Sequence, residues 1–589
     1  MKKVTSMGIA GHTGLILILA YLFYYLRKVN ISLTYYWQQT IPLSFSESLK
    51  IPGGISELVA DLILEYTSHP LLGSAMVAFL LLIVFISLKT IFRRYSSNLF
   101  FYALILAALV PFFLMFNHYR LPFGLVTGLV AGLLLGMFYS YFLTRKLLTG
   151  ALFNFFAGIL VYMVAGVPGL LVLLQVIMIQ VLSSKRYVAL VTVLPLLTIP
   201  LLYLPFNLAV SVKQALLGPI LVSEYDEIPL EFFFGLASPM LLFMFFSILN
   251  LVFSKFRMKN LILISGSSII LVMAGLVYFT RENLNERERN SYEIVQASFN
   301  GEWDKIILLT KEASFINNLI QFEVNRALFV TGQLLDEMFS YPQQFAEKGI
   351  FLDDVSSSYV AVHTAAFYYD LGFANEARHW ATEAQMVMVR HPIVLKQLVM
   401  SYIAIGQEET ALKYLRVLSE SRLYREWCDH VYMMLENNQS GDDPEISFLR
   451  ANNPSIDFFA GTKYPVQKLK IFYRSTKNNH MAFEFLVASH LLQHNIGNVV
   501  FMLPEFKNQG FEQLPRAVEE ALMIYLAKGG DSSRLSGYSV RSSTLERFKD
   551  FNNLIANVDN RSERMQRVSK YKNTYWYYIL FSSPYATKK

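Results

Sequence analysis

Residues 261–280 form the stretch that most constrains how this chain can fold. They read LILISGSSIILVMAGLVYFT and carry no charge. Twenty such residues are about the length that a helix needs to cross the hydrocarbon core of a bilayer. The next ten residues, RENLNERERN, carry six charges. We therefore expect a membrane domain over residues 1–280 and an extramembrane domain over residues 281–589.

The composition divides at the same place. Of the 589 residues, 54% are apolar and 16% are charged, which is too apolar for an ordinary soluble protein. Residues 1–280 contain seventeen Lys and Arg but eight acids, whereas residues 281–589 contain 34 bases and 36 acids. Because the second part has no basic surplus, nucleic-acid binding is not indicated. The single cysteine, Cys428, excludes an internal disulfide framework.

Apolar segments predict an all-α, polytopic transmembrane bundle of about nine spans. We place them at about 9–26, 70–88, 99–116, 122–143, 147–165, 168–183, 187–204, 232–253 and 260–280. The first segment runs into large aromatics without a small-residue cleavage site, which favours a retained span over a cleaved signal peptide. Span seven contains Pro195 and Pro200, is followed directly by Pro205, and should be kinked or broken. Span four predicts close packing against another helix, because glycines recur every four residues at Gly124, Gly128, Gly132 and Gly136.

Lys and Arg are biased toward one side of these spans. With the N-terminus inside, twelve of them fall in cytoplasmic loops and five in outer loops. Such a bias marks the cytoplasmic side. All eight acids of residues 1–280 then lie outside, as does the whole chain after the ninth span. The sequence thus predicts a multi-pass membrane protein with a cytoplasmic N-terminus and an outer C-terminal domain, which lies in the periplasm if the cell has two membranes.

The first outer loop, about residues 30–69, carries the strongest candidate site. Pro52-Gly53-Gly54 predicts a turn, and Ser56 is a candidate helix cap. An acid then recurs every four residues next to apolar positions, at Glu57, Asp61 and Glu65. This pattern describes an amphipathic helix at the membrane surface. Two interpretations remain open: a solvated acidic face, or a carboxylate that binds a divalent cation or acts as a base.

Basic side chains on the same predicted side suggest a phosphate site. His118 and Arg120 close span three on the outer side. A His and an Arg at a membrane exit can bind a phosphate head group, although an interfacial anchor also explains them. The second outer loop, about residues 205–231, contributes Lys213 beside an apolar stretch suited to an interfacial or re-entrant helix.

From residue 285 onward the pattern is that of helical repeats. Two units with a period of 34 align over residues 358–420, where Gly372 matches Gly406 and Ala377 matches Ala411. This resembles the tetratricopeptide pattern. We expect an α-solenoid whose concave face binds a peptide or protein, or that packs on its own membrane domain. Weaker units precede it around Gly301 and Gly332, and the aromatic tail YKNTYWYYILFSSPY suggests a capping element.

Common catalytic motifs are absent. The chain contains no GxxxxGK[ST], HExxH or GxSxG and no paired CxxC. His490 and His494 are spaced to share a metal, but no carboxylate stands at a convincing third position, so we predict ordinary surface histidines and no metal site there. A divalent cation at the loop carboxylates is the one cofactor that the sequence suggests.

The arrangement resembles an uncharacterised family of bacterial multi-span membrane proteins with a C-terminal repeat domain. The resemblance rests on YYWQQ and PGGISE in the first loop, on the short spans and on the repeat-rich tail, and it covers most of the chain. More distantly, the layout is similar to GT-C-type glycosyltransferases, which have a long first outer loop with an amphipathic helix and an acidic catalytic residue. This chain departs from that class because Trp37-Gln38-Gln39, and no acid, follows span one directly.

The distant similarity implies transfer of a sugar from a polyprenyl-phosphate-linked donor during cell-envelope glycan assembly. Glu57 and Asp61 would then be catalytic, and the substrate-binding residues would be His118, Arg120 and Lys213. The alternative is a non-enzymatic, membrane-anchored repeat scaffold that binds envelope proteins. A transporter is disfavoured, because the sequence shows no pair of matched halves and no charge in the middle of a span.

The predicted topology is directly testable with reporter fusions. Alkaline phosphatase fused after Glu282 should be active, because the ninth span would carry it to the outer side. The same reporter fused after Lys146, in a predicted cytoplasmic loop, should be inactive. Activity in the reverse order would show that the spans are miscounted or inverted.

Overall fold

The structure is a computed structural model that divides into two compact units, Met1–Arg289 and Asn290–Lys589. All secondary structure in its described residues is helical, which confirms the predicted all-α class. The described residues are 2–586 apart from 68, 94–100, 120, 142–146, 185–193, 204–211, 218–231, 239–240, 243, 246–257, 283–285, 313–315, 353–357, 455–464 and 477–478.

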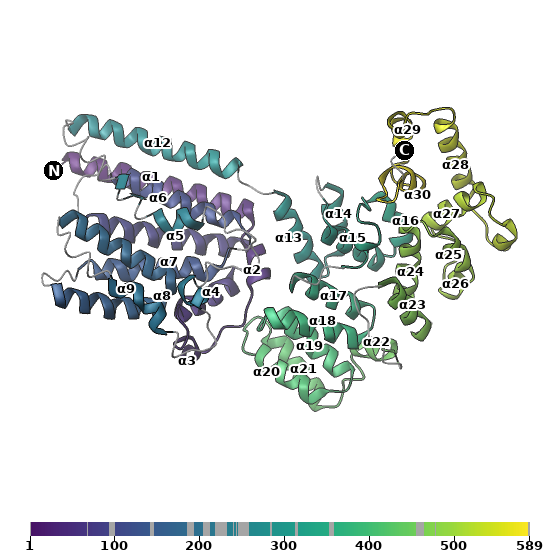
Figure 1. The fold of residues 1–589 in the computed structure, drawn as a ribbon, viewed down its shortest axis with the longest axis horizontal. Coiled ribbons are helices and arrows are strands. Elements are labelled where there is room, and N and C mark those ends of the chain that lie inside the picture. The colour runs from purple at the N-terminus through teal and green to yellow at the C-terminus, as the bar shows by residue number, and fades with distance from the viewer. Residues whose placement is uncertain are drawn as a thin grey trace. The chain divides into compact units, whose positions relative to one another are not determined.

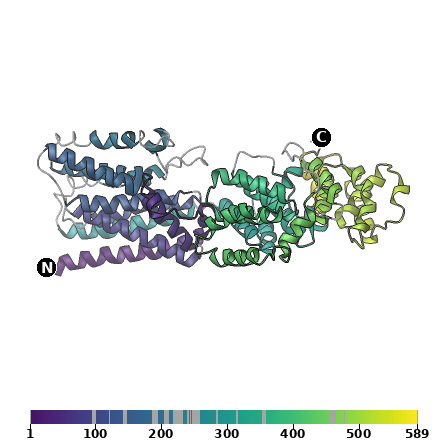
Figure 2. The same ribbon diagram turned by 90° about the horizontal axis from the view of Figure 1, so that it is seen from below.

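Unit 1 is a bundle of long helices whose axes run in nearly the same direction, with α2, α3 and α4 at one end (Figure 1). Figure 2 shows the bundle from a perpendicular direction, with α1 in purple along one edge. Its helices are α1 (Lys2–Val29), α2 (Ser32–Gln38), α3 (Phe45–Ser48), α4 (Gly54–Tyr66), α5 (Pro70–Arg93), α6 (Phe101–Leu114), η1 (Met115–Asn117), α7 (Phe123–Tyr139), α8 (Leu147–Ser184), α9 (Leu194–Tyr203), α10 (Val212–Leu217) and α12 (Met258–Glu282).

By length and composition, two helical stretches of the described residues are long and apolar enough to cross a membrane. They are Pro70–Arg93 and Thr149–Ile179. The first coincides with the second predicted span, and the second covers most of the fifth and sixth. A count of nine spans remains a prediction.

Helix α8 is broken in its middle. The backbone at Gly166 has φ 64° and ψ −156°, outside the helical region. A Cβ added to Gly169 would lie 2.4 Å from the Cβ of Ala165 and 2.9 Å from Cγ1 of Val161. In a continuous helix Val161 would be two turns away. The chain therefore reverses at Gly166, and α8 is a helical hairpin whose arms fall on predicted spans five and six.

The glycine face of α7 packs against this hairpin, as its spacing predicted. A Cβ on Gly128 would lie 2.8 Å from the carbonyl oxygen of Ala165, and one on Gly132 would lie 2.6 Å from Cα of Gly169. Both separations are shorter than any real Cβ contact, so only glycine fits. The backbones of α7 and α8 thus touch directly.

The last long helix of unit 1 pairs with the first. The Tyr21 and Thr280 hydroxyl oxygens lie 2.5 Å apart, and the Tyr25 hydroxyl donates to the Thr280 carbonyl over 3.0 Å. The uncharged stretch of residues 261–280 is therefore anchored on α1 at its C-terminal end.

Unit 2 contains helical hairpins followed by a more irregular helical part. Its elements are α13 (Glu286–Phe299, which starts before the division), α14 (Trp303–Glu312), α15 (Asn318–Val330), α16 (Leu334–Glu337), η5 (Met338–Ser340), η6 (Ala346–Gly349), α17 (Ser358–Asp370), α18 (Ala374–Val387), α19 (Pro392–Ala404), α20 (Glu408–Leu418), α21 (Arg425–Glu436), α22 (Pro444–Asn452), α23 (Pro465–Thr476), α24 (His480–Leu492), α25 (Ile496–Phe501), α26 (Leu503–Asn508), α27 (Arg516–Ala527), η7 (Ser532–Leu535), α28 (Ser542–Ile555), α29 (Arg561–Arg567), η8 (Ser569–Tyr571), α30 (Tyr575–Tyr577) and η9 (Tyr578–Ser582).

Four glycines stand at the inter-helix turns that the sequence marked. All four have positive φ, a conformation that costs glycine little: Gly301, Gly332, Gly372 and Gly406. The matched Ala377 and Ala411 of the following helices are fully buried. Small residues at these positions let α17 pack on α18 and α19 pack on α20.

The core of unit 2 contains charge as well as apolar side chains. Arg326 donates to Glu323 over 2.8 Å and to Asp370 over 2.5 Å, and the Glu323 carboxylate also lies 2.5 Å from Nδ1 of His363. Glu323 and His363 are fully buried. Burial alone would raise the pKa of Glu323, but Arg326 and His363 hold that pKa below its ordinary value.

Helix α24 is buried along almost its whole length, and the aromatic tail packs on it. The hydroxyls of Tyr575 and Tyr578 donate to the carbonyls of Leu491 and Leu492 over 3.0 and 3.2 Å. The tail is therefore a packing element. His490, which we predicted at the surface, is instead buried in α24, and burial lowers its pKa to about 4. The prediction was wrong because α24 is apolar around its whole circumference.

Substitution of Gly132 by Ala should destabilise unit 1. The added methyl would overlap Cα of Gly169 and force α7 from α8, at a cost of roughly 1–3 kcal/mol. Gly275→Ala in α12 is the matched control, because a Cβ there meets nothing within 4 Å. Thermal unfolding of the purified protein in detergent should show a lower midpoint for Gly132→Ala alone. Equal midpoints would contradict the direct contact.

Candidate functional site

The Pro52-Gly53-Gly54 turn is fixed on the break in α8. The Gly53 amide donates to the carbonyls of Tyr162 and Met163, each over 3.0 Å. Gly53 has φ 76°, and a Cβ there would lie 3.1 Å from Cα of Gly166. These carbonyls belong to the end of the first arm of α8, where backbone acceptors lack helical partners. The predicted turn thus caps the hairpin and determines where α4 begins.

Helix α4 packs closely on α7. The Thr127 hydroxyl donates to the Ser56 carbonyl over 2.8 Å, and the Ser56 hydroxyl donates to the Gly53 carbonyl over 2.7 Å. Ser56 was predicted as the helix cap, but Gly53 holds that position and Ser56 lies in the first turn. The buried face of α4 consists of small and medium residues, which permits this close approach: Gly54, Ser56, Ala60 and Leu64.

The exposed face of α4 carries acids and large apolar residues together. Glu57 is exposed, Asp61 and Glu65 are half-buried, and Val59, Leu62 and Tyr66 are exposed by 42%, 38% and 43%. The helix is thus amphipathic, as predicted, but of its large apolar residues only Leu64 is buried, whereas Val59, Leu62 and Tyr66 are exposed. These three remain available to an apolar medium outside the bundle.

Glu57 occupies an unusual position for an exposed acid. Its Cγ would lie 3.3 Å from a Cβ added to Gly124, so its stem rests on the first turn of α7. Protein atoms surround the carboxyl group although its surface is accessible, and this desolvation raises the pKa of Glu57 above its ordinary value. In the described residues no hydrogen bond or ion pair engages it. An exposed acid whose pKa is raised by desolvation is suited to accept a proton.

Gln38 of the YYWQQ segment ties the first loop to the start of α7. Its side-chain amide donates to the carbonyls of Tyr119 and Leu121, the former over 3.3 Å, and its oxygen accepts from the Phe123 amide over 3.0 Å. Gln38 therefore satisfies one of the free amides at the N-terminus of α7. In the sequence, Gln38 stands out only as part of the YYWQQ segment, at a place where the distant similarity implies an acid.

The predicted basic residues are described only in part. His118 follows η1, is half-buried, and packs edge-on against Phe232 at 5.6 Å between ring centroids. Arg120 lies outside the described residues. Lys213 lies in α10, whose Ala215 carbonyl accepts from the Tyr162 hydroxyl over 3.0 Å, but its side chain is not among those described. Helices α4 and α10 thus both contact the first arm of α8 near its break.

The described residues contain no group of three or more His, Cys, Asp or Glu side chains positioned to hold a metal ion. The candidate site therefore consists of the accessible carboxyl group of Glu57 and of Asp61 one turn further along α4. The first turn of α7 and the α8 hairpin support it.

This fold and site define an all-helical protein of two units, with a candidate acidic site in the first. The chain belongs to the DUF6057 family, a family of unknown function, whose model matches residues 5–582. This agrees with the expected membership of an uncharacterised family. Neither the curated proteins nor the solved structures gave a significant match.

The raised pKa of Glu57 predicts a pH-dependent cost to stability. The folded state favours the protonated form, so the stability from this group is complete below its unfolded pKa and is lost as pH rises through the folded pKa. Glu57→Gln should therefore melt above the wild type at about pH 8 and equal it at about pH 4. Glu65→Gln on the same helix is the control. A constant difference across this pH range would show that the Glu57 carboxyl is not desolvated.

Proposed function

We propose that this protein is a polytopic protein of the bacterial inner membrane that transfers a sugar from a lipid-phosphate carrier. Support for the membrane part comes from Pro70–Arg93 and the α8 hairpin. Each arm of α8 has eighteen or nineteen residues, about 27 Å of helix, against about 30 Å for a bilayer core. The bias of Lys and Arg supports an outer, periplasmic location for α4 and unit 2.

The observation that carries the enzymatic proposal is that Glu57 is exposed and has a raised pKa. A general base works best when its pKa lies nearer the working pH than that of a free carboxylate. Desolvation moves the pKa of Glu57 in that direction, and its surface is accessible to a substrate. The exposed apolar residues of α4 would lie beside the lipid tail of a membrane-bound donor.

The proposed reaction uses Glu57 as the base. Its carboxylate takes the proton from an acceptor hydroxyl as that oxygen forms a bond to the anomeric carbon of the sugar. The bond between this carbon and the phosphate oxygen breaks, and its electron pair leaves on the polyprenyl phosphate. Asp61 would orient the acceptor, while His118, Arg120 and Lys213 would stabilise the phosphate charge. A divalent cation bound by the carboxylates of Glu57 and Asp61 would also stabilise the phosphate charge.

A second candidate function, a scaffold for envelope proteins, is favoured by one surface of unit 2. At the turn between α18 and α19, Met386, Val387 and Val389 are exposed by 74%, 61% and 62%. Arg390 in this turn forms an ion pair with Glu420, which follows α20, so the two inter-hairpin turns lie side by side. Clustered exposed apolar residues often mark a protein-binding surface.

Complementation of a deletion strain separates the two functions. Glu57→Gln should reduce the envelope glycan by about a hundredfold or more, the usual effect of losing a general base. Glu65→Gln should complement, with both proteins present at wild-type level. If Glu57→Gln complements fully while Val387→Glu does not, the transferase proposal is wrong and the scaffold is supported.

A further inference from the structure

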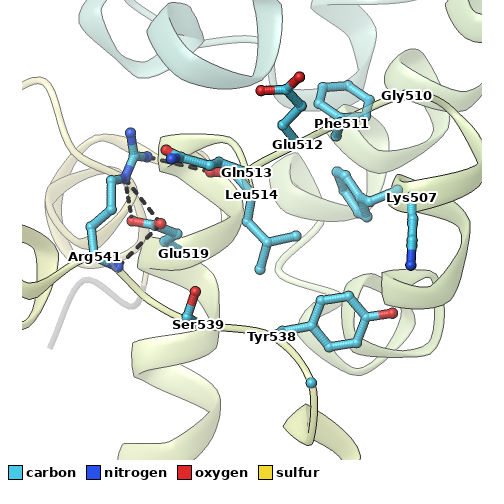
Figure 3. Close-up of a pocket in the computed structure, with 12 residues that line it drawn as sticks. Lys507, Gly510, Phe511, Glu512, Gln513, Leu514, Glu519, Tyr538, Ser539 and Arg541 are labelled. Carbon is cyan, nitrogen blue, oxygen red and sulfur yellow. Dashed lines mark hydrogen bonds and ion pairs between the residues drawn. The ribbon is translucent and has the colours of Figure 1, made fainter.

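A cavity of about 470 Å³ lies in unit 2, between the turn that joins α26 to α27 and the segment that follows η7 (Figure 3). Its size falls within the roughly 300–1,000 Å³ typical of small-molecule sites. None of its residues belongs to the site around Glu57. No sequence motif marks it.

Aromatic rings form two sides of this cavity. Figure 3 shows Phe511 and Tyr538 on opposite sides, with Leu514 pointing between them. Phe511 is held in place by two rings, because it stacks on His480 at 5.3 Å and packs edge-on against Phe506, which also lines the cavity, at 5.2 Å. The cavity therefore offers preformed aromatic faces. Such faces attract the weakly positive C–H groups of a ligand.

The charges around the cavity cancel. Glu519 is 1% exposed and accepts from Arg541 Nε over 2.9 Å and from the Thr544 hydroxyl over 2.6 Å. Arg541 is thereby neutralised and fixed. The other two charges belong to Lys507 and Glu512, both exposed, and no hydrogen bond or ion pair engages their side chains in the described part of the chain. A net charge of zero favours an uncharged ligand over an anion.

Two main-chain amides at the cavity are already hydrogen-bonded. The amides of Phe511 and Tyr538 donate to the carbonyls of Phe506 and Leu535, each over 3.0 Å. A bound peptide strand needs free main-chain partners, which these amides do not offer. Side chains that can donate to or accept from a ligand also line the cavity, among them Lys507, Glu512 and Gln513. Neighbouring hydroxyl groups of a sugar match such a set.

We propose that this cavity binds a neutral oligosaccharide. The C–H faces of the sugar rings would lie on Phe511 and Tyr538, and their hydroxyls would bond to the side chains of Lys507, Glu512 and Gln513. The inference deepens the proposed function, because a sugar transferase needs a place for its growing glycan outside the membrane. The cavity itself is independent of the chemistry at Glu57.

Binding of defined tetrasaccharides to the full-length protein in detergent tests the proposal. Cellotetraose, maltotetraose and chitotetraose are the neutral probes, and tetragalacturonate and a decaproline peptide are the comparison ligands. Saturation-transfer NMR and calorimetry should detect at least one neutral probe at millimolar concentration. Tyr538→Ala should weaken that binding about tenfold, the usual effect of removing a central aromatic contact. Phe501→Ala is the matched control, because Phe501 is 79% exposed and lies outside the cavity.

Three outcomes overturn the proposal: no neutral probe binds, Tyr538→Ala binds as well as Phe501→Ala, or only tetragalacturonate or the peptide binds in a Tyr538-dependent way. The Glu57→Gln variant separates this result from the transferase test. It should keep saccharide binding while losing transfer. If transfer persists in Glu57→Gln and Tyr538→Ala still weakens binding, the proposed function fails and the saccharide site stands.

Discussion

The direct backbone contact between α7 and the α8 hairpin is the constraint on which the rest of unit 1 depends. Gly128 and Gly132 bring α7 against Ala165 and Gly169, on either side of the break at Gly166. Next to the break, the Gly53 amide donates to two carbonyl groups of the first arm of α8. Without a side chain at these positions the helices gain dispersion contacts that do not depend on water, so the packing works equally well in an apolar medium.

The same contact positions the candidate site. Helix α4 starts at the Gly53 turn and lies on α7 through the Thr127–Ser56 hydrogen bond, so Glu57 has to lie against Gly124. Gln38 fixes the start of α7 from the other side. The first loop is thus held at Gln38 and at Gly53 by contacts with helix termini. Such support keeps an accessible carboxyl group in one place, which both a catalytic and a binding role require.

Unit 2 achieves its packing by different means. Its hairpins use positive-φ glycines at the turns and buried alanines between helices. Its interior includes the buried ion pair of Arg326 with Glu323, whose carboxylate also contacts His363. Removing one member of this pair would leave an uncompensated buried charge, which is strongly destabilising. The aromatic tail packs on the end of α24, where the hydroxyls of Tyr575 and Tyr578 donate to main-chain carbonyls of that helix.

The sequence by itself determined the all-helical class, the glycine face of α7, the break between residues 165 and 168, and the turn glycines of unit 2. Each of these follows from local chemistry: apolar runs, the spacing of glycines, and the φ values that only glycine adopts freely. Only the tertiary structure decided which face of α4 is buried, that Gln38 caps α7, that His490 is internal, and that Glu57 is desolvated. The cavity around Phe511 and Tyr538 also required it, since residues 506–514 and 537–541 meet only after folding. Burial and pKa depend on neighbours distant in the chain, and no local pattern records them.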